Sequence, residues 1–445
     1  MATRDPDTSV AILGAGISGL STSYHLGHRD SVVFEAGDGY GGHVTSWTRD
    51  GFTWDDGPHI SFTTNEYVRE LFADNVDREY EELDVRATNY YRGHWIEHPA
   101  QTHLYQVPEP LRSRCLASFL ESVPGDGHPD PSTYREWLHQ AMGPVFADTF
   151  PAAYTRKYWT TDPGNLDVDW IGIRVHRPTV EEVVEGARGP LGRSTYYVAS
   201  RDSRYPSRGG FWSYTHRLAR GATIAYGKRL ERVHFGRRRL GFSDGSEASY
   251  DQLVSTIPLP VLIAAAEDAP PAVREAASQL RCTNFLYVQV AANHPTKREE
   301  FWVYVYDEDK LSTRISFTEK FSPNNAPAGT TGVQVEVYGS PYRPLPSDEG
   351  EVGRRVTDEL VEMGLVEPGA VRSVHVKAVP WGNVIFDLDR RAALAEIDGF
   401  LDDLGVHRAG RYAEWKYLMT DACVLSGRRV ASASAHAVRK PSTVP

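Results

Sequence analysis

The chain has 445 residues, of which 40% are hydrophobic and 24% are charged, as expected for an ordinary globular protein of about two or three domains. Its formal net charge of −11 disfavours nucleic acid and anionic membranes as main partners, although a local arginine cluster can still bind an anion. The 3 cysteines lie far apart and the 16 histidines form no ligand pattern, so neither disulfides nor a metal site is expected. No signal peptide and no apolar run of the ~20 residues that span a membrane is found, which predicts a cytoplasmic protein.

The first elements along the chain are a strand, a helix and a second strand. Residues 9–13 are an apolar run typical of a buried parallel strand, residues 18–26 predict a helix, and residues 31–35 predict the next strand. The glycine-rich turn Gly14-Ala-Gly-Ile-Ser-Gly19 joins the first strand to the helix. This order indicates a βαβ unit.

The turn has the spacing of a dinucleotide-binding fingerprint. Gly14 permits the tight turn, Gly16 lets the backbone approach a pyrophosphate, and Gly19 lets the helix pack close to the sheet. The helix then opens at Ile17-Ser18 with free N–H groups facing the phosphates. Glu35, at the end of the second strand, is placed to bind ribose hydroxyls. NAD and FAD share this fingerprint, so the turn alone does not choose between them.

The rest of the chain contains three segments whose sequence patterns predict different secondary structure. Residues 103–190 are mostly helical in pattern, residues 229–256 predict a meander that leads back to a core strand, and residues 283–380 are rich in β-branched and aromatic residues. The predicted fold is α/β: a Rossmann-like FAD-binding domain with an inserted helical domain and a mixed antiparallel β-sheet domain. We expect the first domain to comprise residues 1–100, 205–282 and 405–445, the helical substrate domain residues 101–204, and the β-sheet domain residues 283–404.

Two further motifs favour FAD. A glycine pair, Gly41-Gly42, follows Glu35 closely and precedes His43, and it resembles the segment that flavoproteins of the amine-oxidase type use to pass the FAD pyrophosphate. Near the C-terminus, Gly410-Arg411 resembles the motif that closes over the cofactor in the same superfamily. Because these matches are separated and in the right order, the resemblance implies FAD as the cofactor.

A longer, collinear series of segments narrows the family. It consists of Gly57-Pro58-His59-Ile60 and residues 95–101, 133–137, 150–154, 157–159, 169–174, 205–210, 253–256, 302–304, 314 and 415–417. Together these segments resemble the UDP-galactopyranose mutases, in particular their longer-chain branch. The resemblance extends over about residues 9–436.

The resemblance implies a reaction and a set of site residues. The reaction is a redox-neutral conversion of a nucleotide-diphosphate sugar between pyranose and furanose forms, galactofuranose in the family, with reduced FAD as the nucleophile and a reductant such as NAD(P)H as electron source. The catalytic residues would be His59, Arg174 and Arg314. The substrate-binding residues would be His98, Gln101, Phe150, Tyr154, Thr155, Trp159, Trp302, Tyr304, Asn383, Tyr417 and Asp421. The cofactor-binding residues would be Gly14, Gly16, Ile17, Ser18, Gly19, Glu35, Ala36, Gly41, Gly42, His43, Gly57, Pro58, His59, Val233, Gly410, Arg411 and Trp415.

The chain departs from the family at places where the substrate is recognised. Asn383 and His98 stand where tyrosines are expected, and Asp421 and Thr155 stand where asparagines are expected. Asp421 matters most, because a carboxylate near the flavin or sugar changes the local charge. The nucleotide (UDP, GDP or TDP), the sugar and the state of oligomerisation are therefore left open.

Two other interpretations stay open. One is an FAD-dependent oxidase or dehydrogenase of the amine-oxidase or protoporphyrinogen-oxidase type, which would need no diphosphate-binding arginines; Arg174 and Arg314 argue against it. The other is a non-catalytic protein that keeps the fold for binding, against which the intact glycine turn and Glu35 speak.

Overall fold

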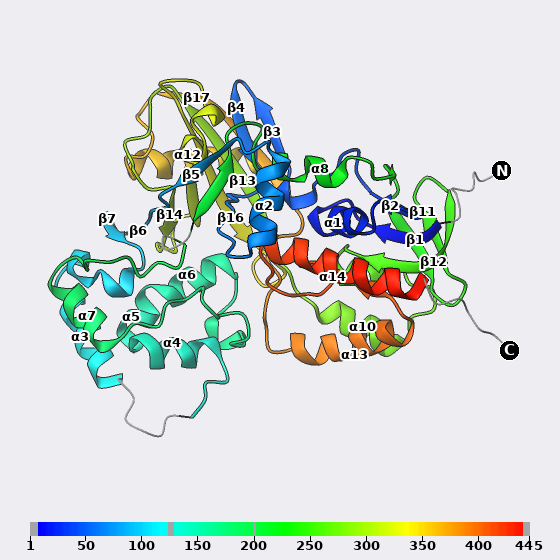
Figure 1. Ribbon diagram of the computed structural model, residues 1–445. Coiled ribbons are helices and arrows are strands. Elements are labelled where there is room, and N and C mark those ends of the chain that lie inside the picture. Colours follow the sequence, from blue (N-terminus) through cyan, green and yellow to red (C-terminus); the bar gives the residue numbers. More distant parts are fainter. Residues whose placement is uncertain (1–7, 123–128, 199–201, 439–445) are drawn as a thin grey trace.

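The computed structural model describes residues 8–122, 129–198 and 202–438. Two seven-stranded sheets and the helices around them form the molecule (Figure 1). The first sheet has the strand order β10-β11-β12-β1-β2-β9, and β18 also pairs with β12. Its strands are β1 (Thr8–Leu13), β2 (Ser31–Phe34), β9 (Ile224–Ala225), β10 (Leu230–His234), β11 (Arg239–Phe242), β12 (Glu247–Ser255) and β18 (His407–Arg408).

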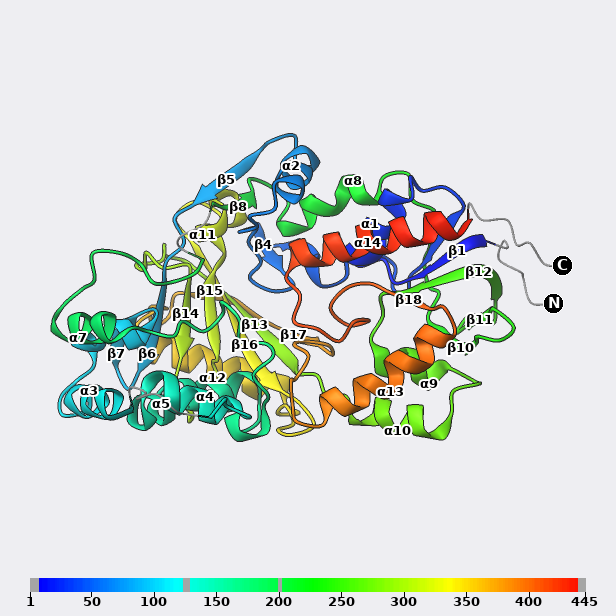
Figure 2. The ribbon, with the colours of Figure 1, turned by 60° about the horizontal axis from the view of Figure 1, so that its bottom comes forward.

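The parallel centre of this sheet sets the position of the nucleotide turn. Leu13 of β1 lies in register with Phe34 of β2 and with Ser255 of β12, so three parallel strands end at one edge. β1 is nearly all buried, as its apolar sequence predicts for a strand covered on both faces. Helices α1 (Ile17–His25) and α14 (Thr420–Val438) pack together on one side of the sheet, and α9 (Leu259–Ala265), α10 (Pro271–Gln279) and α13 (Arg390–Asp403) lie on the other (Figure 2).

The second sheet is antiparallel except for one parallel pair. Its order is β17-β13-β16-β15-β14-β6-β7, and only β14 and β6 run parallel. The strands are β6 (Ala87–Tyr91), β7 (His94–Glu97), β13 (Asn284–Ala292), β14 (Trp302–Val305), β15 (Arg314–Phe317), β16 (Thr331–Gly339) and β17 (Val371–Val379).

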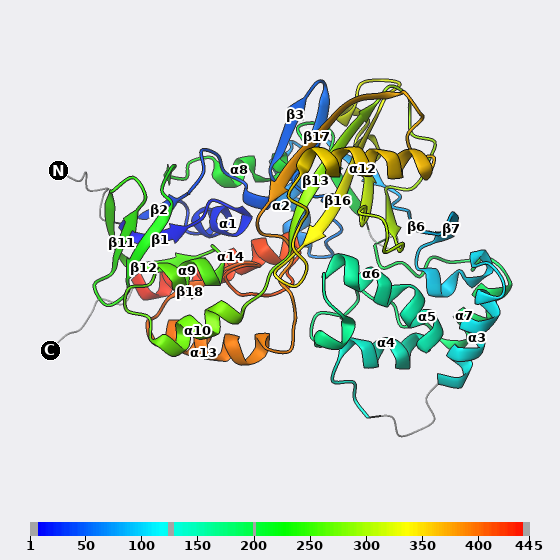
Figure 3. The same cartoon turned by 180° about the vertical axis from the view of Figure 1, so that it is seen from behind.

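The two faces of the second sheet differ because side chains alternate along each strand. In β16, Val333, Val335 and Val337 pack into the core that also contains residues of α12 (Glu349–Glu362). Figure 3 shows α12 lying across β17 and β13 on this outer side. Glu336 and Tyr338, one position out of phase with the valines, line a cavity instead.

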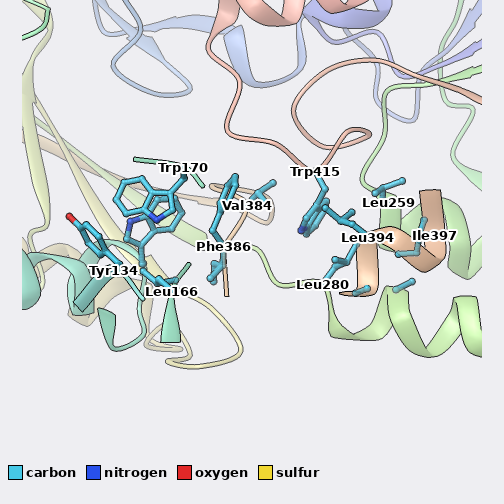
Figure 4. Close-up of a cluster of buried hydrophobic side chains, with 14 of the residues drawn as sticks. Tyr134, Leu166, Trp170, Leu259, Leu280, Val384, Phe386, Leu394, Ile397 and Trp415 are labelled. Carbon is cyan, nitrogen blue, oxygen red and sulfur yellow. The ribbon is translucent and has the colours of Figure 1, made fainter. Parts of the chain in front are cut away.

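The helical unit comprises α3 (Leu111–Ser122), α4 (Tyr134–Met142), α5 (Pro144–Thr149), α6 (Pro151–Tyr158) and α7 (Val180–Arg188). Capping boxes start two of these helices, Thr133 with Glu136 at α4 and Thr179 with Glu182 at α7. One hydrophobic cluster runs from this unit into the nucleotide domain. In Figure 4, Tyr134, Leu166 and Trp170 lie beside Val384 and Phe386, and Trp415 lies with Leu259, Leu394 and Ile397.

Shorter elements connect these layers. They are β3 (Ser46–Arg49) with β4 (Phe52–Asp55), β5 (Tyr80–Leu83) with β8 (Ser203–Pro206), α2 (Glu66–Asn75), α8 (His216–Ala219), α11 (Thr318–Phe321) and the 3-10 turns at residues 42–44, 100–102, 104–106, 163–165, 211–215 and 323–325. No helix in the described ranges combines the length and the apolar character needed to cross a membrane.

The expected fold class is confirmed, and two expected domain boundaries need correction. β6 and β7 fall within residues 1–100, which we assigned to the FAD-binding domain, but β6 pairs with β14 and both strands belong to the second sheet. α13 falls within the expected β-sheet domain, yet it packs against α10 of the first domain. Both differences come from long-range pairing, which local sequence patterns do not encode. Residues 1–7 and 439–445, which we also assigned to the first domain, lie outside the described ranges.

Lys157 provides a test of how the helical unit is joined to the second sheet. Its side chain is 2% exposed, and Nζ donates to the carbonyl oxygens of Val305, Asp307 and Ser312 at 2.9, 2.7 and 2.7 Å. Lys157→Met would remove the shared donor of three carbonyl groups, of which Asp307 O keeps only the N–H of Lys310, so we expect the free energy of unfolding to fall by about 3 kcal/mol or more. Urea denaturation of the FAD-loaded protein measures this. The control Lys297→Met, at a lysine whose side chain is 72% exposed, should change it by under about 0.5 kcal/mol. Equal losses in both variants would contradict the assignment.

Candidate active site

The cavity lies where the carboxyl edge of the first sheet, the polar face of the second sheet and the helical unit meet. Its volume is about 650 Å³. Residues of the glycine turn line one end, and residues of α6, β14, β15 and β16 line the other. A crevice at the ends of parallel strands is where α/β proteins bind nucleotides, and a cavity of this size suits small ligands.

The glycine turn has the geometry that a dinucleotide requires. Gly14 has φ +96°, a left-handed conformation that favours glycine, and its N–H donates to Phe34 O at 2.8 Å. A Cβ on Gly19 would lie 2.0 Å from Gly14 O, so α1 passes directly beneath the turn. Gly16 caps α1 without any side-chain hydrogen bond, which leaves the first N–H groups of the helix for a ligand.

Glu35 holds the neighbouring loops as well as facing the cavity. Its two carboxylate oxygens accept the N–H groups of Ala15 and Gly37, both at 2.8 Å. Gly41 N–H donates to Ala15 O at 2.8 Å, and a Cβ on Gly42 would approach Gly16 Cα to 3.1 Å. Each carboxylate oxygen keeps a second lone pair. The turn, the acid and the glycine pair thus form one cradle, and they fit the adenosine and pyrophosphate parts of FAD.

The loop that carries His59 is fixed by two acids at the end of β4. Asp55 accepts from Ser46 Oγ, Tyr205 Oη and Phe211 N at 2.5, 2.7 and 3.1 Å, and burial raises its pKa to about 6. Asp56 forms an ion pair with Lys377 at 2.5 Å. The chain then turns at Gly57, with φ +130°, and presents His59 to the cavity.

His59 is a neutral side chain with a defined tautomer. Its Nδ1 lies 3.0 Å from Gly57 O, and because a carbonyl can only accept, Nδ1 carries the proton. Its ring centroid lies 5.2 Å from that of Phe211. Burial, followed by the nearby Arg411 guanidinium, lowers the pKa of His59 to about 3 and that of His43 to about 4. Neither histidine carries charge at neutral pH. Both therefore contribute uncharged polar groups to the cavity wall near the glycine turn.

Tyrosines form the opposite end of the cavity. Tyr158 Oη lies 2.9 Å from Tyr417 Oη, and Trp302 Nε1 donates to Tyr304 Oη at 3.0 Å. The hydroxyl of Tyr154 is buried and has no hydrogen-bond partner in the described part of the chain. This end therefore combines aromatic faces with a hydroxyl that is available to a ligand.

Arg174 also lines this end of the cavity. It lies in the segment between α6 and α7, where Nη1 donates to Trp170 O at 2.8 Å and Nη2 donates to Tyr417 O at 2.7 Å. Its guanidinium lies 4.5 Å from the Tyr417 ring centroid. No carboxylate pairs with it within the described ranges, and its buried Nε has no partner. The charge is held in place but not neutralised.

Arg314 differs from the expectation that it pairs with Arg174 as a second free cation. Its Nε and Nη2 donate to the two oxygens of Glu336 at 2.5 and 2.8 Å, a bidentate ion pair. Arg314 and Glu336 are in register on β15 and β16. The pair lines the cavity, but its net charge is zero.

Arg411 is the second guanidinium in the cavity without a carboxylate partner among the described residues. It donates to Leu418 O through Nε at 2.9 Å and Nη2 at 2.6 Å, and to Asn383 Oδ1 through Nη1 at 3.1 Å. It lies 5.1 Å from the ring centroid of Tyr417, the ring that Arg174 also contacts. It directly follows Gly410, which packs against Ser18 at the start of α1, so Arg411 lies toward the glycine turn.

Two of the substituted positions are already engaged within the protein. Asp421 accepts from Thr63 Oγ1 at 2.7 Å and from Ala422 N at 2.8 Å in the first turn of α14. Thr155 donates its hydroxyl to Pro151 O at 2.7 Å within α6. Both line the cavity, but their polar atoms already have partners within the protein.

The structure places most of the expected site residues at this cavity. They are Gly14, Gly16, Ile17, Ser18, Glu35, Ala36, Gly41, Gly42, His43, Gly57, Pro58, His59, His98, Gln101, Tyr154, Thr155, Trp159, Arg174, Trp302, Tyr304, Arg314, Asn383, Arg411, Tyr417 and Asp421.

Five expected residues do not line the cavity. Gly19 lies beneath the turn, and Gly410 packs against Ser18, so each supports the site from behind. Phe150, Val233 and Trp415 are fully buried. The Phe150 ring packs on Phe146 and Tyr306, the carbonyl of Val233 accepts Glu267 N at 2.8 Å, and Trp415 packs with Leu259 and Leu394. We expected Phe150, Val233 and Trp415 to contact a ligand directly, and the structure instead gives these three residues a role in packing.

Sequence reasoning missed several cavity residues. Glu336 was not singled out, although its position between Val335 and Val337 in an alternating strand puts it on the opposite face from the core. Tyr196 and Trp381 lie outside helices and strands, where no periodicity identifies them.

Comparison with known proteins gives the family. The model of the flavin containing amine oxidoreductase family matches residues 17–433, so the chain belongs to this family and is an FAD-dependent enzyme of that superfamily. A crystal structure of reduced UDP-galactopyranose mutase aligns with TM-score 0.89 at 21% identity, covering 97% of this chain and 96% of that chain. A candidate protoporphyrinogen oxidase from Exiguobacterium sp. 255-15 aligns with TM-score 0.74 at 17% identity, covering 98% and 100%.

One curated relative matches over a shorter stretch. It is the 4,4'-diapophytoene desaturase (4,4'-diaponeurosporene-forming) of Staphylococcus aureus strain Newman, 30% identical over 124 residues. The match covers 27% of this chain and only 23% of the desaturase. The structural alignments, at such low identity, show a shared fold.

The close contact at Gly19 gives a test of the cofactor site. In Gly19→Ala the new Cβ would collide with Gly14 O and push α1 away from the turn, so we expect the purified variant to lose most of its FAD. The ratio of flavin to protein absorbance measures this. Gly399→Ala is the matched control, because Gly399 is also a helical glycine and its Cβ would meet nothing within 4 Å. Full flavin content in Gly19→Ala would contradict the geometry.

Proposed function

We propose that this chain is a flavin-dependent nucleotide-sugar mutase that interconverts the pyranose and furanose forms of a sugar linked to a nucleoside diphosphate. The observation that carries the proposal is Arg174, a cavity cation that has no carboxylate partner among the described residues. In a chain of net charge −11, such a cation is suited to an anionic substrate group.

In this proposal, different residues would contact the cofactor and the substrate. Arg174, with the hydroxyls of Tyr304 and Tyr417, would bind the diphosphate as it leaves and returns, as preorganised donors do for developing negative charge. Bound FAD in its reduced form would supply the nucleophile toward the sugar. Arg411, which also lies against the Tyr417 ring, would face the flavin, and the neutral His59 would line the flavin site without adding charge.

The alternative function is an FAD-dependent oxidase or dehydrogenase of the amine-oxidase or protoporphyrinogen-oxidase type. The observation that favours it is the Arg314–Glu336 ion pair, which removes one of the two cations that we expected at the substrate end. An oxidase would consume oxygen with its substrate and would not depend on Arg174.

The proposal is tested with dithionite-reduced, FAD-loaded protein. Incubation with UDP-galactose, GDP-sugars and TDP-sugars, followed by chromatographic separation of pyranose and furanose forms, should show conversion of at least one of them. No conversion of any, together with steady oxygen consumption on an amine or a porphyrinogen, would establish the alternative.

Arg174→Ala tests the residue that carries the argument. We expect turnover to fall about 100-fold or more, because the diphosphate loses its fixed cation, while the flavin content stays unchanged. The matched control is Arg177→Ala, at an exposed arginine of the same segment that does not line the cavity, and it should keep full activity. Loss of flavin in Arg174→Ala would place this residue at the cofactor instead.

A further inference from the structure

His98 and Gln101 lie together on one wall of the cavity. Both follow β7 closely, His98 directly before Pro99 and Gln101 within the 3-10 turn at residues 100–102, and both side chains line the cavity. The ring of His98 lies 4.7 Å from the ring centroid of Tyr196 and 4.8 Å from that of Tyr304. A planar ligand beside these rings would meet the edge atoms of His98 and Gln101.

The proton position of His98 follows from its partner, Asn89. Asn89 is fully buried, and its Nδ2 donates to the carbonyl oxygens of Ile96 and Glu97 at 2.9 and 3.2 Å. Since carbonyls only accept, the amide cannot be reversed, and its Oδ1 faces His98 Nδ1 at 3.1 Å. Nδ1 must therefore donate, which leaves Nε2 as a bare acceptor. Nε2 has no partner among the described residues.

The orientation of the Gln101 side-chain amide also follows from its hydrogen-bond partner. Its Nε2 donates to the carbonyl oxygen of His176 at 2.8 Å, so the nitrogen end of the amide is fixed toward His176. The amide oxygen, Oε1, has no hydrogen-bond partner within the described ranges. The wall thus presents two acceptors, a ring nitrogen and an amide oxygen.

We propose that His98 Nε2 and Gln101 Oε1 form an acceptor pair that binds the base of the nucleotide and selects guanine over uracil. The inference rests on the proposed function and specifies its substrate class. Guanine carries two adjacent donors, N1–H and the N2 amine, which match two acceptors. Uracil carries one donor, N3–H, between two carbonyl oxygens, so one protein acceptor would face an oxygen. A site built for donors discriminates strongly against a ligand that lacks them.

The test uses the FAD-loaded wild-type protein and three nucleotides: GDP, UDP and inosine diphosphate (IDP), which is GDP without the N2 amine. In titration calorimetry, GDP should bind at least about tenfold more tightly than UDP, and IDP should bind about tenfold more weakly than GDP, the effect of one lost hydrogen bond. UDP binding as tightly as GDP would overturn the inference and leave the mutase proposal standing. If none of the three bound and TDP did not bind either, the nucleotide-sugar proposal itself would fail.

His98→Phe keeps an aromatic ring and removes the acceptor. We expect it to weaken GDP about tenfold and to leave UDP within about twofold. His94→Phe, at an exposed histidine of β7 that does not line the cavity, should change neither. An equal loss for GDP and UDP in His98→Phe would show that the ring only shapes the wall.

A measurement on the wild type covers the case in which the variant fails to fold. In ¹⁵N-histidine NMR spectra of the FAD-loaded protein, His98 should show a protonated Nδ1 and an unprotonated Nε2 at neutral pH. The opposite tautomer would overturn the acceptor assignment.

Discussion

The site depends on one constraint, the common end of three parallel strands. Because β12, β1 and β2 stop at the same edge, the turn after β1 and the start of α1 open into the space beside the second sheet. The helix begins there with no side-chain cap, and Glu35 ties the neighbouring loops to the turn through two backbone N–H groups. Residues far apart in sequence are then assembled around a cofactor position that the first 42 residues define.

Charge is distributed unevenly along the cavity. The guanidinium groups of Arg174 and Arg411 both lie against the ring of Tyr417, and neither has a carboxylate partner in the described chain. Arg314, by contrast, is neutralised by Glu336. One cation for each of two anionic groups, a reduced flavin and a diphosphate, is what the proposed reaction needs. An apolar substrate would gain nothing from the charge of Arg174.

The local parts of this site could be predicted from the sequence, and the long-range parts could not. Gly14 and Gly19 were identified correctly because their roles follow from backbone geometry within one turn. The Arg314–Glu336 pair depends on the register of two strands, which no local pattern fixes. The family resemblance implied that Trp415 contacts the cofactor, yet its side chain packs in the core with Leu259 and Leu394.

The central claim is that the flavin serves the reaction without a net change in its oxidation state. The most direct measurement is the flavin absorbance of anaerobically reduced enzyme while a nucleotide sugar is converted. We expect many turnovers between pyranose and furanose forms while the spectrum remains that of reduced flavin. Reoxidation of one flavin for each substrate molecule, with a product that differs from the substrate by two electrons, would contradict it.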